Sequence, residues 1–381
     1  MPMKIEVGRS VRAALLAFLL SRALFFALVV AGSNVAFVRK VYNDRIWETT
    51  VELQRGRIVP QLVIAVMNGD AWYYRSIAVS GYDRRPFAPG PANWAFFPLY
   101  PLAVRLFGGD YAISGMLLAN AALLGALLLL APLTRARGGS DDDAARAVFY
   151  AAFFPTSYFF SMPLPESLFF LLTVAAFFAA QRDRWWLAGI AGALAAATRP
   201  AGILLLPALA LLAIERGVWR RALAWLLLIP IGTAAFMLQL HRLTGNAFAF
   251  AGVQSSWNRH PSAPWTPLLA FLRRPGVIGE PWNLIGLNFA AALLIAAAAA
   301  WFLARRQWSL GAYALLSLLL PLSAGSLQSI ARYAAVVFPL HIALAFAGRR
   351  AAIDRVIVAI SIALFGWLVA LLTLRVDFAL A

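Results

Sequence analysis

The sequence contains no cysteine, only three histidines and few charged side chains. Of its 381 residues 13% are charged, about half of the share that is usual in a soluble domain. Without cysteine, disulfide bonds and thiolate metal sites are excluded. The histidines stand far apart in the sequence and form no metal-binding set: His241, His260 and His341. We therefore predict that the protein uses neither a metal ion nor another cofactor.

Nucleotide-binding motifs are also missing. The sequence has no Walker A motif and no glycine-rich turn between a strand and a helix. The acidic run at 141–143 is similar to a metal-binding cluster, but it lies close to Arg135 and Arg137 and directly before an apolar helix. The N-terminus of a helix with a solvated acidic face explains it better. A site for a nucleotide sugar is therefore not expected.

Apolar residues are in excess and make up 62% of the sequence. The runs 112–132, 284–303 and 353–374 are each long enough, at about 20 residues, to cross the hydrocarbon core of a bilayer. Lys and Arg outnumber Asp and Glu by 33 to 16. Because the basic residues stand in short loops between apolar runs, they are typical of the cytoplasmic loops of a membrane protein and of contacts with anionic lipids. We expect no nucleic-acid partner.

This pattern predicts an all-α integral membrane protein that forms a single polytopic domain over residues 1–381. About eleven transmembrane helices are expected, at 11–31, 111–133, 145–162, 166–181, 186–197, 200–214, 222–240, 284–304, 308–324, 330–347 and 352–374. Two long segments, 32–110 and 241–283, are predicted as outer loops, the first with interfacial helices. Loops with clustered arginine alternate along the chain with loops of little positive charge, which places the N-terminus in the cytoplasm. The first span is predicted as a retained signal anchor.

In the first outer segment, Asp70 stands beside a group of aromatic residues: Trp72, Tyr73 and Tyr74. Aromatic rings present apolar faces to a sugar, and a carboxylate can accept a proton from a hydroxyl group. The alternative is that Asp70 only caps the helix that begins after it. The local sequence favours neither interpretation, so both stay open.

Three arginines are predicted inside the membrane or at its edge: Arg22, Arg199 and Arg332. A charge in that position needs an opposite charge or a water-filled cavity. The phosphate of a lipid is one such partner, because arginine binds phosphate through paired hydrogen bonds. A structural ion pair is the alternative for Arg22, and anchoring at the membrane interface is the alternative for Arg332.

The second outer segment mixes aromatic and polar residues: Gln254, Trp257, Arg259 and His260. An aromatic belt at the membrane surface would explain the tryptophan, but it does not require the polar residues between. The mixture is typical of a saccharide or head-group site. Glu166 follows Pro163 and Pro165 at the outer start of a span, where an acidic residue at a helix N-terminus explains it best.

The order of these residues resembles the PIG-V-like mannosyltransferases, relatives of GPI mannosyltransferase 2 within the GT-C glycosyltransferase superfold. The resemblance covers about residues 10–345 and is carried by Asp70-Ala71, Tyr73-Tyr74, Ile77-Ala78, Gly81-Tyr82, Phe96-Phe97-Pro98-Leu99-Tyr100-Pro101, Pro155, Glu166-Ser167-Leu168-Phe169, Arg199-Pro200-Ala201-Gly202, Gln254, Trp257, Arg259, Pro264-Trp265, Arg332-Tyr333 and Phe338-Pro339. Two positions depart from the family pattern. Gly69 stands where the family has tryptophan, and Leu164-Pro165 lies where it has tyrosine.

The resemblance implies a GT-C-like helical bundle and an inverting transfer of a sugar, with mannose expected, from a polyprenyl-phosphate-linked donor to a hydroxyl group of a glycolipid or glycan acceptor. Asp70 would be the general base. Arginines would bind the donor phosphate: Arg332, Arg199, Arg259 and Arg22. Side chains from several segments would contact the sugar or the acceptor: Trp72, Tyr73, Tyr74, Glu166, Gln254, Trp257, His260 and Tyr333. The two departures leave the identity of the sugar and of the acceptor open.

A secondary transporter or flippase for a lipid-linked glycan is the main alternative function, and a non-catalytic lipid-binding subunit is another. Polar residues near the middle of the membrane, such as Arg22, are typical of transporters. Most candidate site residues instead lie at the outer ends of helices or in the two outer loops. The abundance of alanine and of arginine over lysine favours a bacterial source. We therefore expect a multi-pass protein of the cell inner (plasma) membrane with an extracytoplasmic active site.

Overall fold

A computed structural model describes residues 3–35, 38–42, 48–52, 58–278 and 284–373 of the chain. Most of these residues are helical. The elements of the first half are α1 (Met3–Val35), β1 (Val38–Tyr42), β2 (Glu48–Glu52), α2 (Ile58–Val66), α3 (Ala71–Ser80), η1 (Asn93–Ala95), α4 (Leu99–Phe107), α5 (Tyr111–Ala136), α6 (Asp141–Ala152), η2 (Ser157–Ser161), α7 (Glu166–Gln181) and α8 (Trp185–Thr198).

The second half continues in the same way, with short helices or 3-10 turns between longer ones. Its elements are η3 (Pro200–Leu204), α9 (Leu205–Glu215), α10 (Trp219–Leu226), α11 (Ile229–Thr244), α12 (Ala249–Gly252), η4 (Val253–Trp257), α13 (Thr266–Arg273), α14 (Ile285–Ala304), α15 (Trp308–Leu322), α16 (Ile330–Val336), α17 (Phe338–Ala347) and α18 (Ala351–Thr373).

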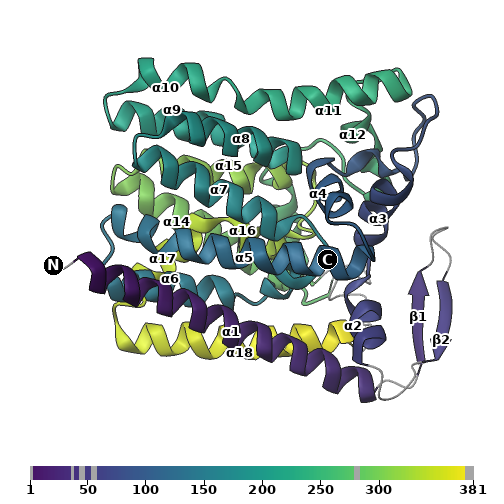
Figure 1. The fold of residues 1–381 in the computed structure, drawn as a ribbon, viewed down its shortest axis with the longest axis horizontal. Coiled ribbons are helices and arrows are strands. Elements are labelled where there is room, and N and C mark those ends of the chain that lie inside the picture. The colour runs from purple at the N-terminus through teal and green to yellow at the C-terminus, as the bar shows by residue number, and fades with distance from the viewer. Residues whose placement is uncertain (1–2, 36–37, 43–47, 53–57, 279–283, 374–381) are drawn as a thin grey trace.

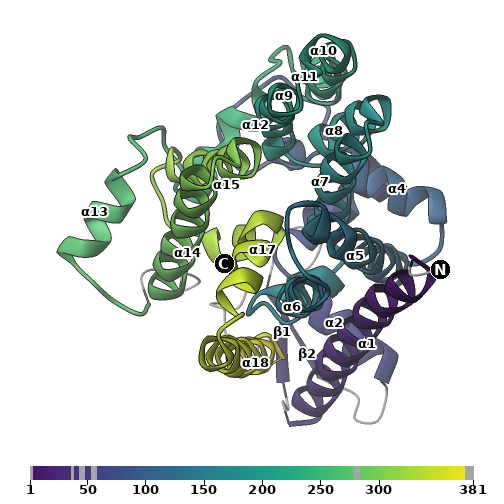
Figure 2. The ribbon, with the colours of Figure 1, turned by 90° about the vertical axis from the view of Figure 1, so that its left-hand side faces the viewer.

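The long helices lie roughly side by side, as Figure 1 shows, and their ends form two opposite surfaces of the molecule. The N-terminus lies at one of these ends. Short helices α2, α3, α4 and α12 and the β1–β2 hairpin gather at the other, which we call the loop end. Seen end-on in Figure 2, the helices cluster around a common interior, and α13 projects sideways beyond α14.

Five helical stretches in the described part of the chain are long and apolar enough to cross a membrane: Gly8–Ser33, Tyr111–Ala136, Trp219–Thr244, Ile285–Ala304 and Ala351–Thr373. A sixth crossing results if the bent pair α16 and α17 is taken as one span. Four further apolar helices are shorter, at 10–17 residues: α7, α8, η3 with α9, and α15. The protein is therefore a multi-pass membrane protein, while the expected total of about eleven spans stays a prediction.

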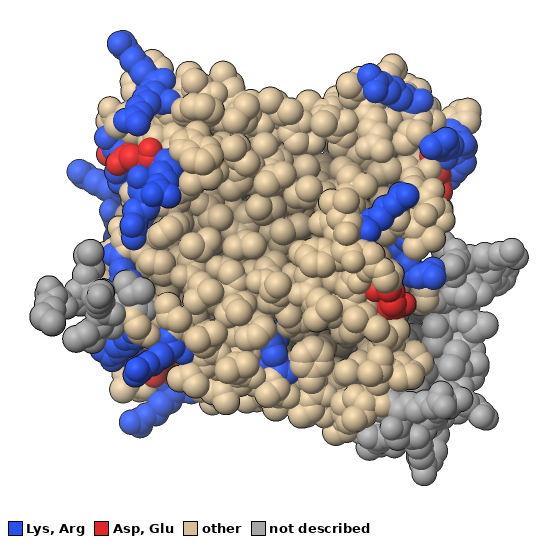
Figure 3. Space-filling model, viewed as in Figure 1, with Lys and Arg blue, Asp and Glu red and all other residues tan. Residues whose placement is uncertain are grey.

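The surface agrees with a membrane environment. In Figure 3 a band without charge crosses most of the middle of the molecule, and the charged residues gather mainly toward its two ends. Helix α1 presents large apolar side chains outward, for example Leu16 and Leu19, which are each 58% exposed. Lipid chains can cover such side chains at no cost, whereas water cannot.

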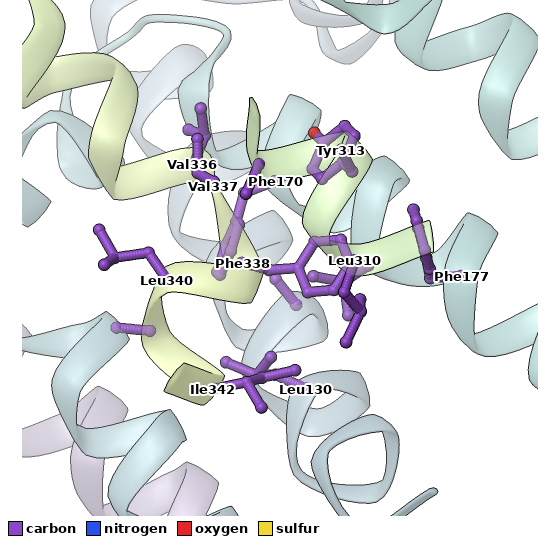
Figure 4. Packing of buried hydrophobic residues seen from close by; sticks show 14 of the residues in the cluster. Leu130, Phe170, Phe177, Leu310, Tyr313, Val336, Val337, Phe338, Leu340 and Ile342 are labelled. Carbon is purple, nitrogen blue, oxygen red and sulfur yellow. The ribbon is translucent and has the colours of Figure 1, made fainter. Parts of the chain in front are cut away.

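The span expected at 330–347 is broken. Helices α16 and α17 meet at an angle of 80° at Val337. Pro339 lies in the first turn of α17, where proline is well tolerated because that turn needs no intrahelical N–H donor. Figure 4 shows the break packed in the core, with Phe338 beside Phe177 of α7 and Tyr313 of α15; ring centroids lie 4.9 and 5.5 Å apart. The packing holds the bend, which hydropathy does not reveal.

Segment 32–110 contains the short helices α2, α3 and α4, and their place at the membrane interface stays a prediction. The same segment adds an element that was not expected, the antiparallel pair β1 and β2, in which Val38 pairs with Glu52 and Tyr42 with Glu48. The side chain of Asp110 begins α5 by accepting hydrogen bonds from the backbone N–H groups of Ala112 and Ile113 at 2.9 and 3.1 Å.

Candidate active site

Asp70 lies at the loop end, directly before α3, but its side chain does not cap that helix. Its backbone is helical (φ −56°, ψ −23°), and its carboxylate makes no hydrogen bond to the first turn. One oxygen, Oδ2, instead accepts a hydrogen bond from Nη1 of Arg332 at 2.7 Å. The Asp70 side chain is 31% exposed. The sequence left two interpretations of Asp70 open. The structure does not have the helix cap that one of them required.

Glu166 connects Arg332 to a second arginine. It begins α7 and is fully buried. Its Oε1 accepts hydrogen bonds from Nε of Arg332 at 2.7 Å and from Nη1 of Arg199 at 2.8 Å, and Nη2 of Arg332 lies 2.6 Å away. This one carboxylate is thus bonded to two arginines, which is more than an acid at a helix N-terminus does. Sequence reasoning preferred that simpler interpretation and missed the pairing.

The positions of both arginines follow from local breaks in the chain. Arg199 has extended backbone between α8 and η3, and Pro200 starts the new turn. Gly202 permits η3 to fold back on α8, because a Cβ atom there would lie 2.3 Å from the carbonyl carbon of Ala195. Arg332 stands in α16, whose start is held by a 2.7 Å hydrogen bond from the backbone N–H of Ala331 to Oδ1 of Asn288.

A third arginine, Arg259, comes from the loop after η4. Its Nη1 donates to Oε1 of Gln254 at 3.2 Å, and its Nη2 donates to the hydroxyl of Tyr333 at 3.0 Å. The ring of Tyr333 also lies under Arg199, whose guanidinium carbon is 5.0 Å from the ring centroid. Through Tyr333, segment 241–283 is thereby joined to the cluster of arginines and carboxylates that contains Asp70.

Two adjoining cavities border this cluster. The first, the polar pocket, has a volume of about 130 Å³ and is lined by Asp70, Tyr74, Phe96, Trp257, Arg332 and other residues. The second, the apolar cavity, has about 240 Å³ and is lined mainly by apolar side chains such as Phe169, Phe250 and Leu320. Both cavities share the residues Arg199, Pro200, Gln254, Arg259 and Tyr333. The guanidinium groups of Arg199 and Arg259 therefore lie where the two cavities meet.

Burial also affects the tyrosines of α3. It raises the pKa of the Tyr74 phenol, which lines the polar pocket, so this side chain is a neutral hydrogen-bonding group. Tyr73 is raised in pKa for the same reason, with Asp70 and Asp83 adding to the effect. Tyr73 does not line the pocket but packs against Phe96, which does; their rings are stacked with centroids 4.7 Å apart.

Five of the predicted residues do not line the polar pocket or the apolar cavity. Tyr73 and Glu166 contact residues that do, and the other three are Arg22, Trp72 and His260. Arg22 is buried elsewhere and donates to the backbone oxygens of Ser157 and Ala152 at 2.9 and 3.0 Å. Trp72 packs against Arg75, whose guanidinium carbon lies 5.7 Å from the ring. His260 is exposed and contributes a backbone hydrogen bond to Ala324. Among the described residues, the partners of Arg22 are carbonyl and hydroxyl groups, not the carboxylate that an ion pair would require.

Several residues at the site gave no signal in the sequence. Thr198 of the polar pocket and Tyr313 and Ser317 of the apolar cavity are examples. They stand in apolar helices, where the local sequence does not distinguish a residue that lines a cavity from one that is packed in the core. Within the described residues there is no group of three or more His, Asp or Glu side chains that could hold a metal ion. The acids of the site are bonded to arginine instead.

No protein-family model matches the chain, and no curated protein matches its sequence. Solved structures do resemble it. They are structures of the oligosaccharyltransferase of Archaeoglobus fulgidus. The apo form has a TM-score of 0.47 at 14% identity over 96% of this chain and 55% of that one. The form tethered with an acceptor peptide containing the NVT sequon has 0.47 at 17% identity, over 96% and 54%.

A third structure, the enzyme AglB of the same archaeon in complex with an inhibitory peptide and a dolichol-phosphate, has a TM-score of 0.43 at 16% identity over 81% of this chain and 50% of that one. The chain spans about half the length of these structures.

Proposed function

We propose that the protein is a membrane glycosyltransferase of the GT-C type. It transfers a sugar, with mannose expected, from a polyprenyl-phosphate-linked donor to a hydroxyl group of a glycolipid or glycan acceptor. One observation carries the proposal: the carboxylate of Asp70 lines a polar pocket, and Arg199 and Arg259 line both this pocket and an adjoining apolar cavity. A lipid-linked sugar consists of parts in the same order: an apolar tail for the apolar cavity, a phosphate for the shared arginines and a polar sugar for the polar pocket.

The donor would lie across both cavities. Its apolar tail fits among the side chains of the apolar cavity, since burial of hydrocarbon is favourable. The phosphate then reaches Arg199 and Arg259, which line both cavities. Arginine suits this position because its planar donor group matches the oxygens of a phosphate. The sugar would occupy the polar pocket, with its reacting carbon toward Asp70.

Asp70 is proposed as the general base. Its Oδ2 is bound to Arg332, and the structure records no hydrogen bond to Oδ1 from the described residues, so this oxygen is free to accept a proton. The acceptor oxygen would attack the first carbon of the sugar from the face opposite the phosphate, which gives inversion. The bond to the phosphate breaks with its electron pair on the phosphate oxygen, where the arginines stabilise the new charge.

The acceptor would approach over aromatic side chains. Trp257 and Phe96 both line the polar pocket, and their ring centroids lie 5.8 Å apart. Faces of aromatic rings bind the apolar faces of sugars, and the neutral Tyr74 hydroxyl offers a hydrogen-bonding partner. This supports a saccharide acceptor on either a lipid or a larger glycan.

The site is proposed to face the outside of the inner (plasma) membrane, with the N-terminus in the cytoplasm. Support comes from the loops at the end opposite the site, which carry clustered arginine at 135–137, 182–184, 216–221, 305–306 and 349–350. Arg22 does not favour the transporter alternative, because it binds backbone and hydroxyl oxygens of the Ala152–Ser161 region and lines neither cavity.

The test uses purified protein in nanodiscs with polyprenyl-phosphate mannose and a crude pool of lipid and glycan acceptors. Release of polyprenyl phosphate is followed for the wild type, for Asp70→Asn and for the control Asp83→Asn, an exposed carboxylate of the same segment. We expect release by wild type and Asp83→Asn, and a loss of about 10³-fold for Asp70→Asn. Equal release by all three would remove Asp70 from catalysis. No release by wild type, with this donor or with other lipid-linked sugars, would contradict the proposed function.

A further inference from the structure

The charges around the polar pocket are nearly balanced. Within the described residues, five charged side chains line this pocket or bond directly to an arginine that does: Asp70, Glu166, Arg199, Arg259 and Arg332. Three are positive and two negative, which leaves one net positive charge. Tyr74 does not change this number, because burial raises the pKa of its phenol and keeps it neutral.

Glu166 is the least expected member of this group. Its side chain is fully buried, so the carboxylate has lost its hydration. Its Oε1 binds two arginines, while Oε2 is buried without any hydrogen-bond partner among the described residues. A buried acceptor without a partner is costly. A neutral side chain would avoid part of that cost, so what the carboxylate supplies here is its charge.

We propose, on the basis of the proposed function, that Glu166 is a specificity-determining residue that fixes the charge of the polar pocket at one net positive unit and thereby matches it to a lipid phosphodiester. Glu166 does not touch the substrate in this arrangement. It acts through Arg199 and Arg332, to which it is bonded, and so it is a positioning residue for the phosphate-binding arginines.

The charge match holds on both sides of the reaction. The donor is a phosphodiester with one negative charge, which cancels the charge of the pocket. During transfer the acceptor oxygen forms a bond to the sugar, the phosphate leaves with the bonding electron pair, and the hydroxyl proton moves to Asp70. The phosphate then carries two negative charges, and the pocket, with Asp70 protonated, carries two positive ones. A site of low dielectric favours such balance before and after the step.

The experiment measures binding, not turnover. Two probes share one tail and one phosphate but differ in charge: farnesyl methyl phosphate has one negative charge, and farnesyl phosphate has two at pH 8, because its second pKa is about 6. Their dissociation constants are measured by calorimetry on the full chain in detergent. The ratio of the constant of the diester to that of the monoester is the selectivity for the more highly charged phosphate. Overall losses of affinity cancel in this ratio.

We expect the selectivity to follow the net charge of the pocket. Glu166→Gln adds one positive unit and should raise the selectivity about tenfold, while Arg199→Gln removes one and should lower it about tenfold. The double variant has the wild-type charge and should return to within about twofold of the wild type. Should Glu166→Gln alone not fold, the comparison of the double variant with Arg199→Gln measures the same contribution of Glu166, and an equal selectivity of these two would overturn its role.

A selectivity that stays within about twofold in every variant would overturn the role of Glu166 and leave the proposed function standing. If the wild type bound neither probe, both the role of Glu166 and the lipid-phosphate site would be overturned. If Glu166→Gln weakened both probes equally, the residue would serve the fold alone, and the inference would again be wrong.

Discussion

Two fully buried carboxylates, each bonded to two arginines, lie at opposite ends of the molecule. Glu166 stands at the loop end with Arg199 and Arg332. Asp143 stands in the first turn of α6 with Arg349 and Arg146, at 2.7 and 3.3 Å. By burial and by charge the two acids are alike. The difference between them lies in their remaining partners and in what their arginines border.

Asp143 is saturated with hydrogen bonds. With Ser140 it forms a capping box, in which the backbone N–H and the hydroxyl of Ser140 donate to its Oδ2 at 2.8 and 2.9 Å, and its other oxygen accepts from Arg146 and Arg349. Glu166 has one oxygen without a hydrogen-bond partner in the part of the chain that the structure describes, and its arginine Arg199 lines two cavities. A saturated acid holds a helix end and a loop together. The acid of the other cluster is bonded to arginines that line cavities, where a ligand can reach the arginines.

The largest effect is expected from Arg332→Met, which leaves the buried Glu166 with fewer donors and Asp70 without its partner. Sugar transfer should fall at least about 100-fold, because charge on the phosphate and the base is no longer balanced. Loss of one member of a buried charge set should also lower the free energy of unfolding by about 3–5 kcal/mol. Turnover in nanodiscs and thermal unfolding measure the two effects.

The matched control is Arg349→Met at the opposite end, whose side chain is 53% exposed. Its turnover per folded molecule should stay within about twofold of the wild type. Equal losses of activity for both variants would show that the two clusters do not differ in function as proposed.

A second large effect, on stability alone, is expected from Arg22→Met. The substitution leaves the backbone oxygen of Ser157 and the hydroxyl of Ser161 without their donor. The free energy of unfolding should fall by about 1–3 kcal/mol, since buried acceptors lose a partner. Activity per folded molecule should not change. A loss of lipid-donor binding without a loss of stability would instead return Arg22 to the substrate site.

A smaller, pH-dependent effect is expected from Asp143→Asn. Burial by itself would raise the pKa of this carboxyl, but the hydrogen bonds from Arg349 and Ser140 outweigh it and hold the pKa below its usual range. A lowered pKa in the folded state contributes stability above the unfolded pKa of about 3.9, and this contribution is lost as pH falls through the folded value. The difference in Tm between wild type and variant should therefore shrink as pH is lowered from 5 to below 4. A difference that grows in this range would contradict the assignment.

The smallest effect is expected from Asp142→Asn, the neighbour of Asp143 in the same acidic run. Its partner is Arg9 at 2.9 Å, and both side chains are more than half exposed, at 63% and 68%. Pairs in contact with water contribute little, because solvent screens them and holding long side chains costs entropy. Tm should not change measurably at pH 7. A clear loss would show that the acidic run acts as a unit and that burial does not separate its members.

The sequence by itself determined the membrane class, the positions of most helices and the break at Arg199-Pro200. These features depend on windows of about 20 residues, in which hydropathy and proline act locally. It also singled out Asp70, Arg199, Arg259 and Arg332. The sequence did not reveal which of these residues are bonded to one another, nor that Glu166 is bonded to two of them.

Only the tertiary structure decided which charges meet. Arg332 is separated in sequence by 262 residues from Asp70 and by 166 from Glu166, and helix packing alone brings them within hydrogen-bonding distance. Arg22 illustrates the same limit, since its acceptors in Ala152, Ser157 and Ser161 lie 130 or more residues away. A charged residue in an apolar segment indicates that a partner is needed, but the identity of that partner depends on which helix faces meet. That choice is made by packing over the whole molecule, and no local pattern contains it.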